Sequence, residues 1–408
     1  MHQRLRNLIA DFPRQFWILF GGTLVNAIGG GMVFPFLTLY LHQRLNISMT
    51  YVGVILLIWS ASALIGQLVG GSLTDQLGRK KLMAFSLGAN ALVLVGFGLA
   101  DSFLFGIVVA MLAGFIGALF QPARDAMIAD LVEPGKRAQA YGLIRVVANL
   151  GIAIGPAIGG FLAAQSYMIV FLGNASTAFA FCLITIFFMR ETKPTVVAID
   201  RAESAPSGNL LDVLRDYRFI VFCGAIALCT VLAGQMMAVL PVYMKDQFGL
   251  GETFYGWVMT TNAGMVVLLQ LPITRMTQRV PRLFLTAAGA LLYALGVFSV
   301  GFGNAFPHFI AAMVIYTFGE MVLVPTSTAV TADLAPADMR GRYMGILGLT
   351  WSIGFGIGPI VGGLISDNIS PSAIWFLTAL SGLLAAMIFL ALKRFAPMQT
   401  RPVSFNET

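Results

Sequence analysis

The chain has 408 residues and a formal net charge of +7, and 58% of its residues are hydrophobic whereas only 11% are charged. A water-soluble core cannot bury that much apolar surface, so the composition excludes a soluble protein and predicts an integral membrane protein. The positive charge does not indicate a nucleic-acid partner, because an excess of Lys and Arg is the normal composition of cytoplasmic loops.

Twelve apolar stretches are long enough to cross the roughly 30 Å of hydrocarbon in a bilayer as helices, and the alternating pattern of strands is absent. They cover residues 15–41, 51–74, 82–100, 103–131, 138–164, 168–190, 218–244, 254–275, 283–303, 307–334, 341–366 and 372–393. An even number of spans puts both termini on one side, and most Lys and Arg fall in the tails and in the loops after even-numbered spans. This bias predicts a multi-pass membrane protein with both termini cytoplasmic.

The chain contains a duplication, because residues 122–160 recur in altered form at residues 325–363, 203 positions further on. Both copies keep a Pro, an Ala-Asp-Leu triplet, an Arg and a Gly-x-x-x-Gly-Pro-x-x-Gly-Gly run. The offset is half the chain, which predicts two pseudo-symmetric six-helix bundles, 1–190 and 218–408, joined by a polar cytoplasmic linker at 191–217. Parallel repeats of this kind place a binding site at their interface, near mid-membrane.

The loop after the second span reads Gly71-Ser-Leu-Thr-Asp75-Gln-Leu-Gly78-Arg79-Lys80-Lys81. Here Gly71 is expected to let helices approach closely, Asp75 to cap or pair at the cytoplasmic end, and Gly78 to turn the chain. The three cations that follow are expected to face the inner leaflet.

This stretch resembles the signature loop of the major facilitator superfamily, and the resemblance covers all twelve spans. It implies transport by alternating access, with Asp75 and Arg79 holding the cytoplasmic side closed in one state. In the second half, Gln278 occupies the position that corresponds to Asp75, so any such latch has its acid in the first half only. The alternative is a positive-inside turn without a mechanical role.

The fifth and eleventh spans carry the same glycine pattern. It resembles the motif associated with antiporters of the drug-efflux branch, and its glycines and proline permit tight packing and bending. Because the pattern occurs in both spans, helix packing alone is the alternative. The residues are Gly151, Gly155, Pro156, Gly159 and Gly160, and Gly354, Gly358, Pro359, Gly362 and Gly363.

Charged residues also occur inside the fourth and fifth spans. Asp125 and Arg145 are predicted at similar depth on antiparallel helices, so we expect them to pair, with Arg124 as the competitor for Asp125. Asp130 and Arg137 form a shallower candidate pair. These charges serve either in gating and proton coupling or in static pairing. The Arg that many drug antiporters carry in the outer half of the fourth span has no counterpart at residues 110–112.

Glu320 is the only acidic residue predicted at mid-membrane, and no Lys or Arg is predicted at its depth. A carboxylate there loses hydration, so its protonated form competes with the charged form near neutral pH. We therefore expect Glu320 to exchange a proton for a cationic substrate. The alternative is a permanently protonated side chain that bonds a neighbouring helix.

Other side chains are expected to line the central cavity, where adaptable Met suits substrates of many shapes, although plain packing is the alternative. They are Asn26, Phe34, Gln235, Met236, Met237, Asn262, Tyr316 and Trp351.

Together with these residues, the resemblance implies a monomeric secondary transporter of the bacterial inner membrane that exports amphipathic or cationic small molecules by alternating access in exchange for protons. We expect no enzyme, cofactor or metal site. The Gly-x-x-x-x-Gly-Lys-Ser/Thr sequence that binds nucleotide phosphates is absent. The energy for transport is therefore expected to come from an ion gradient or from the gradient of the substrate itself. The same fold importing or flipping a metabolite, sugar or lipid is the first alternative. A membrane enzyme or a non-transporting sensor is the second, and it lacks a cluster of His, Cys or paired carboxylates.

Overall fold

The computed structural model describes residues 11–193, 210–336 and 339–395. Over these ranges the secondary structure is helical without strands, and twelve helical segments are long and apolar enough to cross a membrane. The predicted fold class, an all-α integral membrane protein, is therefore confirmed.

Each half contributes six of the twelve segments. The first half contains α2 (Arg14–Leu45), α3 (Met49–Leu77), α4 (Arg79–Gly98), α5 (Phe103–Ala118) continued by α6 (Phe120–Leu131), α7 (Arg137–Ala163) and α8 (Tyr167–Phe188). The second half contains α10 (Tyr217–Gly234) continued by η2 (Gln235–Val239) and α11 (Leu240–Phe248), then α12 (Glu252–Thr277), α13 (Arg282–Val300), α14 (Phe306–Leu334), α15 (Arg340–Asn368) and α16 (Ala373–Phe395). A short helix, α9 (Leu210–Arg215), lies within the predicted linker.

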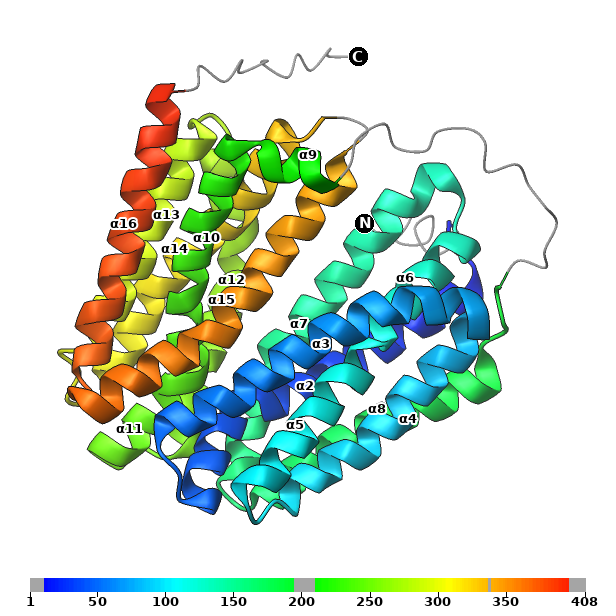
Figure 1. Cartoon of the computed structure of the whole chain (residues 1–408), viewed down its shortest axis with the longest axis horizontal. Coiled ribbons are helices and arrows are strands. Elements are labelled where there is room, and N and C mark those ends of the chain that lie inside the picture. The colour runs from blue at the N-terminus through cyan, green and yellow to red at the C-terminus, as the bar shows by residue number, and fades with distance from the viewer. Residues whose placement is uncertain (1–10, 194–209, 337–338, 396–408) are drawn as a thin grey trace.

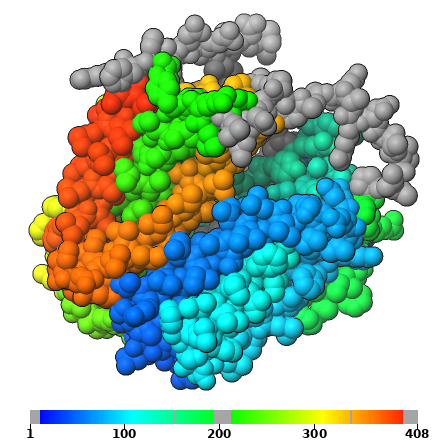
Figure 2. Space-filling model, viewed as in Figure 1, coloured from blue at the N-terminus to red at the C-terminus, as the bar shows by residue number. Residues whose placement is uncertain are grey.

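The two halves meet at one face of the protein and separate toward the other (Figure 1). We call the side on which α2 begins and α16 ends the terminal face, and the other side the opposite face. Close contacts between the halves lie near the opposite face, where Gly363 of α15 meets Met49 and Gly160 of α7 meets Gly256 of α12. Figure 2 shows the surface recessed between α15 and α7 toward the terminal face. The recess between the two halves therefore lies toward the terminal face.

The glycine run of α7 permits close packing within the first half. A Cβ atom added to Gly151, Gly155 or Gly159 would lie 2.6 Å or less from atoms of α2. At Gly155 the atoms that it would meet include the Gly31 backbone. Residues four apart share a helix face, so a side chain at any of these positions would push α2 away.

The run of α15 repeats this packing in the second half. Cβ atoms at Gly354, Gly358 and Gly362 would meet α10 and η2. Helix packing, which the repeated pattern predicts, thus accounts for three glycines in each run, whereas Gly160 and Gly363 face the other half.

The seventh span changes to a π-helical turn at its centre, and Pro241 supplies the reason. Proline has no backbone N–H, so the carbonyl four residues earlier, that of Met237, loses its usual helical donor. The Tyr255 hydroxyl of α12 compensates, since it donates to Met236 O at 3.1 Å and to Met237 O at 3.3 Å. Single π-turns are common at functional sites because they redirect side chains.

Candidate functional site

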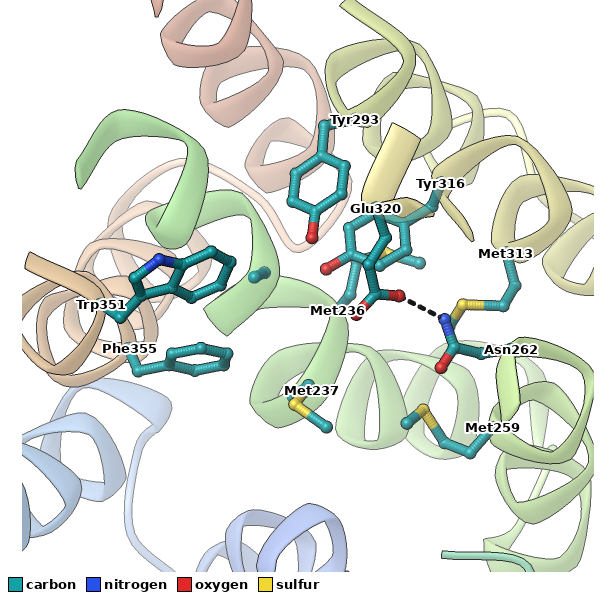
Figure 3. Close-up of a pocket in the computed structure, with 11 residues that line it drawn as sticks. Met236, Met237, Met259, Asn262, Tyr293, Met313, Tyr316, Glu320, Trp351 and Phe355 are labelled. Carbon is teal, nitrogen blue, oxygen red and sulfur yellow. Dashed lines mark hydrogen bonds between the residues drawn. The ribbon is translucent and has the colours of Figure 1, made fainter. Parts of the chain in front are cut away.

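A pocket near mid-membrane is lined by side chains of the second half (Figure 3). The repeat predicted a site formed by both halves, and the lining of this pocket differs from that prediction because its side chains come from η2, α12, α13, α14 and α15 and from the end of α10. Its volume is ≈ 50 Å³, which is well below the several hundred Å³ of a drug-sized site. The pocket therefore fits one group of a larger ligand, such as an ammonium. Its lining is rich in Met and aromatic side chains: Met236, Met237, Met259, Asn262, Tyr293, Met313, Tyr316, Glu320, Trp351 and Phe355, with Ala233.

Glu320 lies at the midpoint of α14, and its carboxylate is held by an amide. Asn262 Nδ2 donates to Glu320 Oε2 at 2.7 Å and also approaches Thr317 Oγ1 at 3.0 Å. Over the described ranges Glu320 forms no ion pair with Lys, Arg or His. The carboxylate is half-buried in an apolar lining, so a charge on it has little compensation beyond one amide bond.

Two stacked tyrosines form the wall beside Glu320. The rings of Tyr293 and Tyr316 have centroids 4.2 Å apart and an interplanar angle of 23°. Their helices approach closely at small residues, because a Cβ on Gly296 of α13 would lie 2.7 Å from Tyr316 and one on Gly319 of α14 would lie 2.7 Å from the Tyr293 backbone. This packing fixes the aromatic face, which is suited to a cation or an aromatic group.

Of the eight residues expected to line the cavity, five line this pocket: Met236, Met237, Asn262, Tyr316 and Trp351. Gln235 does not, because its side chain is fully buried and donates to Gly358 O of α15 at 2.8 Å. Phe34 instead packs edge-on against Trp59 within the first half, at 6.4 Å between centroids. Asn26 is half-buried in α2 outside the pocket lining.

The loop between α3 and α4 is held by an acid that sequence reasoning assigned to the linker. Gly78 has a φ of 97°, which disfavours any side chain, and Glu191 lies against it. Glu191 Oε1 accepts backbone N–H groups of Arg79, Thr192 and Lys193 at 2.9, 3.0 and 3.1 Å. Burial raises the pKa of Glu191, but these bonds and that of Lys80 together hold it below its usual range.

The side chain of Arg79 pairs within its own half. Its Nε lies 2.9 Å from Asp130 of α6 and its Nη2 lies 3.4 Å from Asp75. The same pair recurs in the second half between Arg282 and Asp333, at the same 203-residue offset. Since the described residues give Asp75 and Arg79 no partner in the other half, the expected latch is not engaged here.

Two predictions about the region of this loop are wrong. The pair of Asp130 and Arg137 does not form, because Asp130 binds Arg79 and Arg137 donates instead to Val132 O at 3.1 Å. Gly71 does not serve close packing, since a Cβ there would meet nothing within 4 Å, whereas one on Gly66 would lie 2.2 Å from Phe115 O. The recurrence of Arg79 and Asp130 at one offset was the available signal for the correct pair.

The expected pair of Asp125 and Arg145 is also absent. Arg124 Nη2 lies 2.8 Å from Asp125 Oδ1, so the neighbour in sequence wins the competition. Tyr141 of α7 donates to the Asp125 carbonyl at 2.9 Å, and Arg145 is exposed. The physical reason is distance: Arg124 is next to Asp125 in the chain and reaches its carboxylate by side-chain rotation alone, whereas Arg145 lies on another helix.

Polar contacts at the opposite face join the halves, and no motif in the sequence indicates them. His42 Nε2 lies 3.1 Å from Asp246, and its Nδ1 lies 2.7 Å from Ile47 O, an arrangement that fits the doubly protonated ring. The Thr50 hydroxyl donates to Asp367 at 2.6 Å.

A third link of this kind involves Glu252, which binds Lys245 at 2.6 Å and accepts a bond from the Tyr167 hydroxyl of the first half. Together these contacts hold the opposite face closed.

Twelve helices long enough to cross a membrane, in two related halves, with a half-buried carboxylate in a mid-membrane pocket and a recess toward one face, define the architecture of a membrane transporter. The profile of the Major Facilitator Superfamily matches residues 19–243 and 221–406. The chain belongs to this superfamily, whose members are transporters and not enzymes.

Similar proteins carry several names. The chain is 27% identical to an uncharacterized MFS-type transporter, YqjV, of Bacillus subtilis over 92% of each chain. It is 28% identical to a Na(+), Li(+), K(+)/H(+) antiporter of Planococcus maritimus over 86% of this chain and 89% of that one. It is 25% identical to the multidrug resistance protein MdtH of Escherichia coli O1:K1 / APEC over 93% of each.

Solved structures share the fold at lower identity. A POT family transporter in complex with 5-aminolevulinic acid has a TM-score of 0.78 at 16% identity, covering 94% of this chain and 96% of that chain. A bacterial homologue of the human lysosomal transporter Spinster, in an inward-facing and occupied conformation, has a TM-score of 0.76 at 14% identity, covering 93% and 96%.

Proposed function

We propose that this transporter exports amphipathic or cationic small molecules in exchange for protons, by alternating access. The relative named for multidrug resistance and the relative named as a cation/proton antiporter support this class of cargo and coupling. We also propose that the terminal face is cytoplasmic, that the membrane is the bacterial inner membrane and that the protein acts as a monomer.

Glu320 is the observation that carries the proposal. A single carboxylate in an apolar pocket, with Asn262 as its hydrogen-bond donor, is neutralised either by a proton or by a cationic substrate. A proton and a cationic substrate cannot both neutralise this one carboxylate at the same time, so binding of either one favours release of the other. The Met and aromatic lining accepts apolar groups of varied shape, which suits a broad range of cargo.

The test is proton-driven uptake into liposomes that contain the purified protein, with tetraphenylphosphonium as the cationic probe. Glu320→Gln mimics the protonated form, so it should abolish uphill, pH-dependent uptake and weaken probe binding by roughly 10- to 150-fold, the loss of about 1.5–3 kcal/mol for a charged partner. Glu133→Gln removes an equal charge from an exposed loop and should behave as the parent. Uphill, pH-dependent uptake by Glu320→Gln at the parent rate would exclude the coupling role.

A second candidate is exchange of a monovalent metal cation for protons. It is favoured by the oxygen atoms of Glu320 and Thr317, which bind the same Asn262 amide, and by the name of the Planococcus maritimus relative. The same liposomes distinguish the two functions, because a gradient of Na⁺ or K⁺ then moves protons without tetraphenylphosphonium.

We propose a gating role for the loop from Gly71 to Lys80. Arg79 is already oriented by Asp75 and Asp130, so the loop presents a preformed charge cluster at the terminal face. When the halves close there, this cluster meets the second half, and the latch is one-sided because Gln278 replaces the acid in the other copy. Arg124, Asp125 and Arg145 are proposed to act at the same opening, since they lie on α6 and α7 toward the terminal face.

A further inference from the structure

A second pocket lies at the terminal face, where α2 begins and α8 ends, and it shares no residue with the Glu320 pocket. Its volume is ≈ 380 Å³, within the range of sites for small molecules. Its lining consists of Arg14, Gln15 and Ile18 from α2 and of residues 187–190 from the end of α8. The transport function proposed above uses none of these residues.

The pocket has a positive charge. Over the described ranges, neither Arg14 nor Arg190 forms an ion pair, and both side chains are exposed. The acids nearest in sequence are engaged elsewhere, because Asp11 binds Lys136 at 2.7 Å and Glu191 accepts backbone N–H groups at the start of α4. Two unpaired guanidinium groups on one pocket favour an anion, and they match phosphate geometry in particular.

One wall of the pocket is apolar, because Phe187 and Phe188 form part of its lining. Phe187 and Phe188 are 73% and 61% exposed at the end of a helix that is apolar enough to cross a membrane, so we expect their rings to face hydrocarbon. Trp17 and Phe16 pack edge-on at 5.4 Å in the first turn of the neighbouring α2. Aromatic residues gather at the level where headgroups meet acyl chains, which places the arginines beside the headgroups.

The two arginine-bearing segments are also tied to each other. The backbone N–H of Arg190 donates to Gln15 Oε1 at 3.2 Å, so the end of α8 is fixed to the first turn of α2. Deeper in the bundle these helices approach closely, since a Cβ on Gly29 of α2 would lie 2.0 Å from the Thr177 hydroxyl of α8. The fold thus holds the two backbone segments that carry Arg14 and Arg190 next to each other without a ligand.

We propose that this pocket binds the headgroup of an anionic phospholipid, with its phosphate against Arg14 and Arg190 and its acyl chains along Phe187 and Phe188. The charge alone would suit a free phosphate equally well. The exposed rings at the mouth favour a lipid, because only a lipid presents hydrocarbon beside its phosphate. The site would hold the ends of α2 and α8 together in the membrane.

The experiment is native mass spectrometry of the full-length protein in neutral detergent with dioleoylphosphatidylglycerol or dioleoylphosphatidylcholine. The parent protein should retain the anionic lipid selectively. The double variant Arg14→Gln with Arg190→Gln should lower that retention about 30-fold, to the level of the zwitterionic lipid. As the matched control, Arg275→Gln with Arg279→Gln removes the same charge from exposed positions at the end of α12 and should leave retention unchanged.

Two outcomes would overturn the proposal. One is undiminished retention of the anionic lipid by the Arg14 and Arg190 double variant. The other is complete displacement of the lipid by excess inorganic phosphate, which would identify a free-anion site. If the variant does not fold, crosslinking of the parent protein with a photoactivatable phosphatidylglycerol decides the question. The crosslinks should fall in peptides that contain residues 14–18 or 187–190. Crosslinks confined to other peptides would refute the site.

Discussion

The contact between Gly363 and α3 offers a direct test of how the opposite face is closed. An Ala at this position would place its Cβ 2.5 Å from Met49 C and Thr50 N, which no pair of helices tolerates. Rotamer change cannot relieve the clash, because the neighbouring atoms are backbone. The adjacent bond from Thr50 to Asp367 would have to yield as well.

Parting the halves at the opposite face removes the clash, so Gly363→Ala should favour the state that is open there. Overpacking by one methyl group costs about 1–3 kcal/mol, which shifts the equilibrium between the two states roughly 5- to 150-fold. Distances between spin labels in the loops at 46–48 and 369–372 measure this shift in lipid. Labelling is selective, because the native Cys182, Cys223 and Cys229 are buried.

Two further substitutions in α15 serve as controls. Gly348→Ala adds the same methyl where nothing lies within 4 Å, so the label distances should stay as in the parent. Gly358→Ala meets α10 of the same half, at 3.0 Å from Val231 O, and should lower thermal stability without opening the opposite face. Equal distance distributions for Gly363→Ala and Gly348→Ala would refute the assignment of this contact to closure.

Three other predictions concern charged groups. Asp246→Asn removes the partner of His42 and should shift the same label distances toward the open state by up to about fivefold, the value of one partly exposed ion pair; no shift would mean that this pair does not lock the face. Asp75→Asn should move the population toward states open at the terminal face and slow transport, and distance measurements across that face check it. The pKa of Glu191 is lowered in the folded state, so the stability that Glu191 contributes is complete above its usual pKa of about 4.3 and is lost as the pH falls through the lower pKa of the folded state. Glu191→Gln should therefore flatten the acid side of a profile of thermal stability against pH. An unchanged profile would contradict this.

The sequence alone was enough to predict the fold class, Glu320 and five of the other side chains that line its pocket. Span lengths and the 203-residue repeat are one-dimensional properties, so the predicted twelve helices are the ones found. Glu320 stands out in the sequence because acids are rare at mid-membrane and because no cation is predicted nearby. That its partner is the Asn262 amide follows only from the packing of α12 against α14. The repeat also held a pair that was not read from it, since Arg79 with Asp130 and Arg282 with Asp333 recur together.

Tertiary structure alone decided which side chains meet. Each residue turns a helix by about 100°, so Gly159 faces α2 of its own half whereas Gly160, one residue later, faces α12 of the other. Depth in the membrane suggested a pair between Asp125 and Arg145, but depth says nothing of rotation about the helix axis, and Arg124 was nearer. The closed opposite face likewise depends on residues far apart in sequence, such as His42 and Asp246, which only the packing of two halves brings together.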